Sequence, residues 1–147
     1  MTTSDWQTAA ATLRVAAQLV DGVQAGLVSR GFPDVRPVHG FAFAVLSGGD
    51  TTTAGLATSL GVTKQAAAQL VDHLVGCGYL TRRSDPRDGR AQLLVLTERG
   101  HACTAAAEQA AAAVIEGWRI QVSAPRFAEF AQALETLAEP GRLRPAW

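Results

Sequence analysis

Ser84-Asp85-Pro86-Arg87-Asp88-Gly89-Arg90 lies between two short stretches, residues 79–83 and 91–96, that are predicted to be β-strands. Aspartate, proline and glycine all favour chain reversals, each for a different backbone reason. The pattern predicts a β-hairpin with arginines at its tip. The role of this hairpin depends on what precedes and follows it.

Two closely spaced helices are predicted directly before the hairpin. Thr52 or Thr53 can cap a short helix that Gly61 ends. Thr63 can then cap a longer helix that ends near Gly76. Two helices joined by a short turn containing glycine are typical of a helix-turn-helix. A polar hairpin directly after the second helix is typical of a wing.

Longer helices are predicted on both sides of this unit. The first runs from a capping box at Ser4 to about Ser29, and Pro37 opens a second that ends at residues 48–49. After the hairpin, Thr97 opens a long helix to about residue 122, and a last helix covers residues 123–139, before a loose tail. Several apolar residues of these helices are expected in the core or a dimer interface: Leu13, Val20, Val114, Trp118, Phe127, Phe130 and Leu134.

Bulk composition gives little sign of a nucleic-acid partner. The 147 residues carry 13 basic and 13 acidic side chains, so the net charge is zero, although four arginines fall between Arg82 and Arg90. No apolar run reaches the roughly 18 residues that span a bilayer. The N-terminus lacks the basic flank and apolar block of a secretion signal. We therefore expect a cytoplasmic protein with no membrane partner.

The order of the elements and the hairpin residues resemble the MarR family of bacterial transcriptional regulators. Asp88-Gly89-Arg90 is similar to the family's Asp-x-Arg wing, and Leu96-Thr97-Glu98-Arg99-Gly100 is similar to its Leu-Thr-x-x-Gly helix start. The resemblance implies a homodimer whose first and last two helices interlock. It also implies a palindromic operator in double-stranded DNA and, commonly, a small aromatic or phenolic effector that releases the DNA.

The predicted fold is mostly α with a small β-hairpin wing (α+β), a winged helix-turn-helix with dimerisation helices at both ends. Residues 1–36 are expected to form an N-terminal dimerisation helix and connector. Residues 37–100 are expected to bind DNA, and residues 101–147 to form the C-terminal dimerisation helices. The predicted function is sequence-specific transcriptional regulation, as a ligand-responsive repressor.

The second helix of the helix-turn-helix supplies the first set of candidate DNA contacts. Thr63, Lys64, Gln65 and Gln69 lie in its first two turns, where side chains reach base edges in the major groove. Glutamine can pair with adenine, and lysine can donate to guanine or phosphate. The rest of this segment is mainly alanine, a departure from the family that leaves few side chains for reading bases.

The wing supplies the second set of candidate DNA contacts. Arg87 and Arg90 suit a minor groove, where narrow A·T-rich DNA concentrates negative potential. Asp88 between them is expected to orient an arginine through a charge-assisted pair. Arg82 and Arg83 alternate along a strand, so at most one is expected to face DNA, and Arg83 is included among the candidates.

The start of the second helix supplies candidate ligand contacts. His39, Phe41 and Phe43 lie there, and the resemblance implies that this helix lines the effector cleft. The alternative is structural: His39 serves as a polar residue of the helix start, and the two phenylalanines belong to the core.

Other functions remain as alternatives. Cys77 and Cys103 could make a redox regulator on the same fold, although neither has a basic partner nearby in sequence, and buried free thiols are the simpler interpretation. A winged-helix module that binds a protein rather than DNA is a further alternative. An enzyme is not expected, because the three histidines fall in separate elements and no nucleophile, metal-ligand or cofactor pattern is present.

Overall fold

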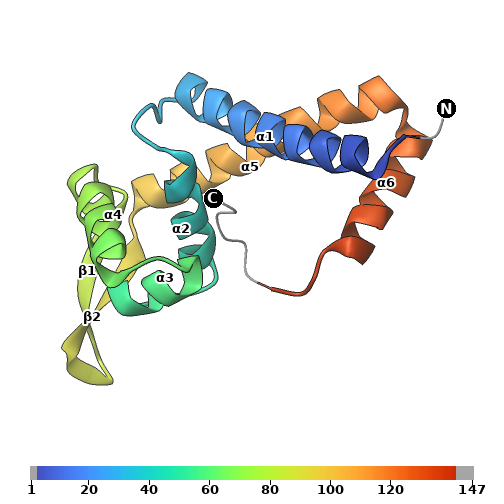
Figure 1. Ribbon diagram of the computed structural model, residues 1–147. Coiled ribbons are helices and arrows are strands. Elements are labelled where there is room, and N and C mark those ends of the chain that lie inside the picture. The colour runs from blue at the N-terminus through green and yellow to red at the C-terminus, as the bar shows by residue number, and fades with distance from the viewer. Residues whose placement is uncertain (1–2, 142–147) are drawn as a thin grey trace.

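The computed structural model describes residues 3–141, which form six helices and one β-hairpin (Figure 1). In chain order the elements are α1 (Asp5–Ser29), α2 (Pro37–Ser47), α3 (Thr53–Leu60), α4 (Lys64–Gly76), β1 (Leu80–Asp85), β2 (Asp88–Leu96), α5 (Glu98–Val122) and α6 (Ala124–Leu137). The predicted fold class, mostly α with a hairpin wing, is confirmed. The expected loose tail falls largely on residues 142–147, outside the described residues.

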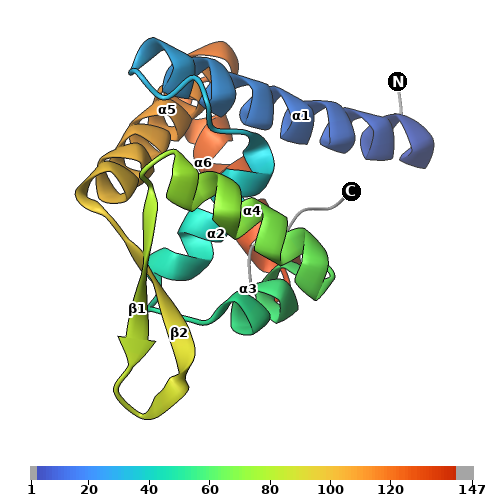
Figure 2. The same ribbon diagram turned by 90° about the vertical axis from the view of Figure 1, so that its left-hand side faces the viewer.

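The elements divide into two groups that α5 connects (Figures 1 and 2). We call α2, α3, α4 and the hairpin the lobe, and α1, α5 and α6 the frame. The hairpin projects from the lobe on the side away from α1 and α6. No helix within residues 3–141 is long and apolar enough to cross a membrane.

Small residues let α1 and α5 approach each other closely within the frame. A Cβ atom placed on Gly26 would lie 2.4 Å from the Cβ of Ala110 and 3.3 Å from its Cα. One turn earlier, a Cβ on Gly22 would lie 2.4 Å from a methyl group of Val114. The two helices therefore need glycine at these positions, since real Cβ atoms do not approach other atoms so closely.

The lobe is built on a continuous apolar core. Its fully or nearly fully buried members come from the connector before α2 and from every element of the lobe: Val35, Phe43, Leu46, Leu56, Leu60, Val71, Leu74, Tyr79, Leu80, Leu94 and Leu96. Cys103 of α5 is fully buried against them. The first two turns of α5 thus belong to the lobe, and its later turns belong to the frame.

A close backbone approach fixes the start of α5. The Thr97 N–H donates to the carbonyl of Tyr79, and the Thr97 hydroxyl caps the helix by accepting the Gly100 N–H at 3.1 Å. A Cβ on Gly100 would lie 2.3 Å from the same Tyr79 carbonyl oxygen. Threonine and glycine are therefore both required where the long helix leaves the hairpin.

The wing is longer than the sequence predicts. β1 and β2 are antiparallel and pair from Leu80 with Leu96 to Asp85 with Asp88, so that only Pro86 and Arg87 remain in the tip. The register shifts next to Ser84, which leaves residues 89–91 of β2 without partners, as in a bulge. The predicted strands, residues 79–83 and 91–96, end too far from the tip, because local turn propensity does not report how far cross-strand pairing extends.

Large apolar side chains remain exposed on the frame. Leu13 is 71% exposed, Ile120 76%, and Phe130 and Leu134 are also exposed, whereas Phe127 is buried. A single chain thus leaves several large apolar side chains uncovered on the three helices of the frame.

The close contact between α1 and α5 predicts that a methyl group added at Gly26 destabilises the protein, whereas one added at a glycine with free space does not. Gly26→Ala places its Cβ against the backbone and Cβ of Ala110, which cannot rotate away. We expect the free energy of unfolding to fall by about 1–3 kcal/mol, the usual cost of overpacking, as measured by urea denaturation followed by circular dichroism.

Gly40→Ala in α2 is the matched control, because a Cβ there meets nothing within 4 Å. Alanine has the higher helix propensity, so this variant should gain up to about 1 kcal/mol. Equal stability of the two variants would contradict the close contact between the helices.

Candidate nucleic-acid interface

The helix-turn-helix is fixed by two threonine caps and one glycine. Thr52 accepts the Gly55 N–H at 3.0 Å at the start of α3, and Thr63 accepts the Ala66 N–H at 3.1 Å at the start of α4. Between the helices Gly61 has a φ of 68°, in the left-handed region that glycine tolerates best. The caps hold α4 at a defined angle to α3, with its N-terminal turn exposed.

α4 divides cleanly into a buried face and an exposed face. Its buried face consists of Ala67, Val71 and Leu74. Lys64, Gln65 and Gln69, three of the predicted DNA contacts, are all exposed, and so is the cap residue Thr63. The structure therefore brings these four residues together on one accessible surface at the start of the helix.

The wing tip is stiffened by two aspartates that accept backbone hydrogen bonds. Asp85 accepts the Arg87 N–H at 2.9 Å, and Asp88 accepts the Arg90 N–H at 3.0 Å. The expected pairing of Asp88 with an arginine side chain is wrong for this structure, because its carboxylate is used by the neighbouring backbone in an Asx turn.

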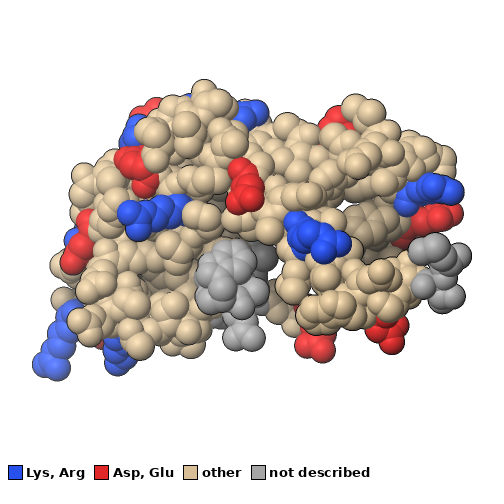
Figure 3. Space-filling model, turned by 45° about the horizontal axis from the view of Figure 1, so that its top comes forward, with Lys and Arg blue, Asp and Glu red and all other residues tan. Residues whose placement is uncertain are grey.

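The side chains of Arg87 and Arg90 are left exposed by this arrangement. Within residues 3–141, neither they nor Lys64 form an ion pair. Figure 3 shows basic side chains projecting at the lower left of the molecule, where the wing lies in Figure 1. Unpaired positive charge is therefore present at the wing tip and at the start of α4.

The two arginines at the base of the wing are both paired. Arg82 of β1 lies 2.5 Å from Asp72 of α4, and Arg83 lies 2.7 Å from Asp50 in the loop before α3. At most one of them was expected to face DNA, and in the free protein both have an acidic partner, so the assignment of Arg83 to DNA stays a prediction. The partners lie 10 and 33 residues away in sequence, so no local pattern revealed them.

His39 occupies a structural position rather than a place in the predicted ligand site. Its Nδ1 accepts the Arg36 N–H at 2.9 Å, which caps α2, and its ring stacks on that of His73 with centroids 4.7 Å apart. Burial lowers the pKa of His39 to about 4, and the neighbouring charges of His73 and Arg36 act in the same direction. The imidazole is therefore neutral near pH 7, as its role as an acceptor requires.

A polar cluster that the sequence did not indicate joins the connector before α2 to the lobe. Tyr79 donates to Asp34 at 2.5 Å, and Arg99 donates to the Tyr79 hydroxyl at 3.0 Å. The hydrogen bond from Tyr79 lowers the pKa of Asp34, whereas burial raises the pKa of Tyr79. Arg99 belongs to the Leu-Thr-x-x-Gly motif at the start of α5, but no local sequence pattern indicates that it lies beside Asp34.

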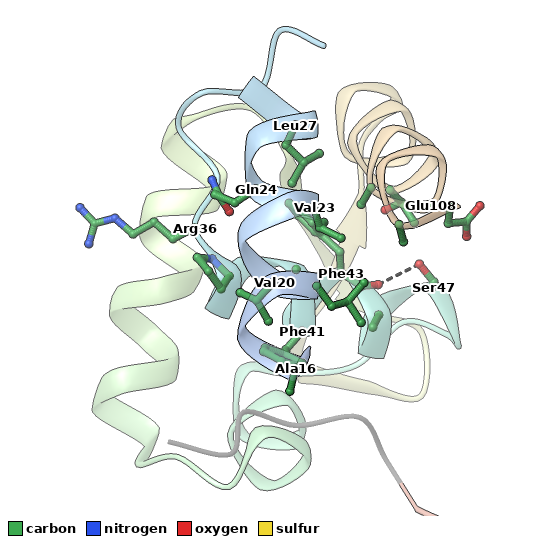
Figure 4. Close-up of a pocket in the computed structure, with 17 residues that line it drawn as sticks. Ala16, Val20, Val23, Gln24, Leu27, Arg36, Phe41, Phe43, Ser47 and Glu108 are labelled. Atoms are coloured by element: carbon green, nitrogen blue, oxygen red, sulfur yellow. Dashed lines mark hydrogen bonds between the residues drawn. The ribbon is translucent and has the colours of Figure 1, made fainter. Parts of the chain in front are cut away.

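A cavity of about 670 Å³ lies between α1, α2 and α5. Phe41 and Phe43, two of the three candidate ligand contacts, line it, and His39 does not. Figure 4 shows an apolar centre, with the charged ends of Arg36 and Glu108 pointing away from it. Such a cavity suits a small apolar or aromatic molecule.

The cysteines do not have the environment of redox sensors. Cys103 is fully buried, and burial raises the pKa of its thiol to about 11. Burial and the nearby Asp34 also raise the pKa of Cys77. Sensor thiols need a lowered pKa, so neither cysteine supports the redox alternative. No group of three or more potential metal ligands occurs within residues 3–141.

Comparison with known proteins identifies relatives of this arrangement. A family model described as MarR family matches residues 31–91. The solved structure of RV1404 from Mycobacterium tuberculosis is 25% identical, with a TM-score of 0.81, and the match covers 96% of this chain and 97% of that one. RV2887 from the same organism, solved in complex with salicylic acid, is 27% identical with a TM-score of 0.67, over 93% and 98% of the two chains.

The transcriptional repressor CouR, solved on a 23-mer DNA duplex, is 21% identical with a TM-score of 0.68, over 88% of this chain and 90% of that one. At this identity the likeness is one of fold. No curated protein matches the chain by sequence.

The buried cap at His39 predicts a stability that depends on pH. The unfolded chain protonates this imidazole near pH 6.5 and the folded chain only near pH 4, so stability falls as the pH drops through that range. The loss between pH 7 and pH 4.5 is expected to be about 2 kcal/mol.

His39→Gln is the informative variant, because glutamine at the third helical position can still accept the Arg36 N–H and does not titrate. Urea denaturation at several pH values should show that its stability falls less steeply between pH 7 and 4.5 than that of the parent. Identical slopes for the two proteins would contradict a buried neutral imidazole.

Proposed function

We propose that this chain, a MarR family protein in its fold and in residues 31–91, binds double-stranded DNA of defined sequence as a homodimer and so regulates transcription. MarR family proteins are transcription regulators, not enzymes. One observation carries the proposal: exposed Lys64 on α4 and exposed Arg87 and Arg90 on the wing form no ion pair within residues 3–141. CouR, which shares the fold, is bound to a DNA duplex in its structure.

α4 is proposed to enter the major groove. Gln65 and Gln69 lie one turn apart on its exposed face and can each offer an amide to adenine. Lys64 can donate to guanine or to a phosphate, and Thr63 lies where it can contact the backbone. Ala66, which is also exposed, is small enough to allow a close approach to the bases and can touch a thymine methyl group.

The wing is proposed to reach the adjacent minor groove with Arg87 and Arg90. The two aspartates at the tip hold the backbone through the hydrogen bonds described above, so the arginines project from a preformed turn. A preformed turn reduces the entropy lost on binding.

A homodimer is proposed on the basis of the exposed apolar side chains of the frame. Trp6, Leu13, Ile120 and Leu137 are more than two thirds exposed, and they come from α1, α5 and α6. A second copy of the chain would cover such surfaces, and twofold symmetry would present two α4 helices to two half-sites of a palindromic operator.

A small aromatic effector is proposed to occupy the cavity between α1, α2 and α5 and to weaken DNA binding, which would make the protein a ligand-responsive repressor. The cavity joins the frame to the lobe, because its walls include Leu27, Phe43 and Ala107 from three different helices. RV2887 was solved with salicylic acid, and this molecule is the natural first probe.

The proposed wing contact predicts a specific defect in Arg90→Ala. A duplex obtained by selection from random oligonucleotides should bind this variant at least about tenfold more weakly than the parent, and the dependence of log K on log salt should become shallower by about one per arginine removed. Fluorescence anisotropy measures both quantities, and light scattering checks that the oligomeric state is unchanged.

Arg14→Ala, which removes an exposed arginine of α1 on the frame, is the control and should bind like the parent. Parental affinity in Arg90→Ala would show that the wing does not contact DNA. Failure of the parent to select any duplex would instead favour a protein-binding module.

The effector proposal predicts that filling the cavity uncouples the protein from its ligand. Gly40 lines the cavity, and a Cβ atom placed there meets nothing within 4 Å, so the backbone can carry a larger residue whose side chain would take up part of the cavity. Gly40→Leu should therefore bind the selected duplex like the parent but lose at least about tenfold in affinity for salicylate by calorimetry. If the parent shows no heat of binding with salicylate or with neutral aromatic probes of similar size, the effector proposal is wrong.

A further inference from the structure

The base of the wing is held from two sides. Successive side chains of a strand point to opposite faces, so Arg82 of β1 reaches Asp72 on α4 while Arg83 reaches Asp50 in the loop before α3. The N–O distances are 2.5 and 2.7 Å. Each ion pair therefore connects the hairpin to a different part of the helix-turn-helix.

A backbone contact strengthens one of these connections. Leu94 of β2 donates its N–H to the carbonyl of Thr51 at 2.7 Å. Thr51 follows Asp50 directly, so the same loop is joined to β1 by an ion pair and to β2 by a hydrogen bond. The hairpin cannot swing away from α4 or from this loop without breaking at least one of these contacts.

The placement of the two carboxylates is unexpected for a surface that attracts DNA. Asp72 is exposed and lies one turn after Gln69 on α4, where an unpaired carboxylate would repel phosphates. Its pairing with Arg82 removes most of that repulsion, and it also removes most of the attraction that Arg82 would exert. The paired arginines thus lie at the base of the wing, whereas Arg87 and Arg90 at its tip and Lys64 at the start of α4 form no ion pair within residues 3–141.

We propose that Asp72 and Asp50 are positioning residues for DNA binding, which act through Arg82 and Arg83 to set the angle between the wing and α4. The inference rests on the proposed function. It holds that neither Arg82 nor Arg83 contacts a DNA phosphate. A two-stranded hairpin is marginally stable by itself, so the direction of its tip depends on contacts at its base. A protein that must engage two grooves at once loses less entropy when this angle is fixed before binding.

A charge swap separates positioning from phosphate contact. Arg82→Asp and Asp72→Arg each break the pair, and the double variant restores it with the same net charge and with the partners exchanged. Affinity is measured for the selected duplex and for a shuffled duplex at several salt concentrations. The ratio of the affinity for the selected duplex to that for the shuffled duplex measures specificity. It is high only when α4 and the wing contact the DNA at the same time.

Each single variant should lower this ratio by about fivefold, which is the scale of one surface ion pair. The double variant should return to within about twofold of the parent, and the dependence of its log K on log salt should be unchanged. The pair of Arg83 with Asp50 should behave in the same way. If the double variant stays as weak as Arg82→Asp and its salt slope is shallower by about one, Arg82 contacts phosphate and the inference is overturned.

A measurement without DNA distinguishes this inference from the proposed function. Nitroxide labels at Gly89 of the wing and Gly76 at the end of α4, in a Cys77→Ser background, report the distance between the two elements by pulsed dipolar spectroscopy. Arg82→Asp and Asp72→Arg alone should each broaden the distribution of distances between the two labels. The double variant should narrow it again. Parental width in the single variants would overturn the inference even if the protein binds DNA. A parent that binds neither duplex would overturn both the proposed function and the positioning role.

Discussion

The burial of Tyr79 is the constraint on which the arrangement of the two groups of helices depends. Its N–H donates to Leu74 at the end of α4, and its carbonyl accepts the N–H of Thr97 at the start of α5. Its hydroxyl donates to Asp34 in the connector between α1 and α2. One fully buried residue thus joins the last turn of α4, the base of the wing, the first turn of α5 and the connector. A shift of the connector or of the start of α5 relative to α4 must alter at least one of these hydrogen bonds, and a buried group left unpaired is costly. Because α1 continues from the connector and the rest of α5 from its start, the same bonds set where the frame begins.

Where this protein presents positive charge depends on which arginines have an acidic partner, and not on a net positive charge. The chain has no net charge, yet the positions that face outward on α4 and the wing tip hold unpaired cations. Arg82, Arg83 and Arg99 have acidic partners, and these ion pairs lie where the wing and the connector attach to the lobe. The local field at a surface depends on which charges are neutralised nearby, so a neutral protein can still present a positive surface.

The sequence predicted the elements better than it predicted the roles of the polar residues. Helix limits were correct because caps such as Thr52 and Thr63, and the glycine at position 61, act within a few residues and leave a local pattern. The partners of Arg83 and Tyr79 lie 33 and 45 residues away, and no local pattern encodes them. The length of the wing was missed for the same reason, because cross-strand pairing is a long-range property. The DNA contacts themselves remain predictions, supported by exposure and by the lack of competing ion pairs.

The alanine-rich start of α4 gives a reason for the fixed base of the wing. As the proposed recognition helix, α4 has two glutamines and one lysine on its accessible turns and could form few direct base contacts. Discrimination between sequences must then come partly from the shape of the DNA, since groove width and bending vary with sequence even where no base is touched. A protein reads shape only if its contact points are held at fixed separations, because a flexible wing would adjust to any groove. If the proposed function is correct, rigid attachment of the wing to α4 is therefore the feature that would let a helix with few base-reading side chains take part in specific binding.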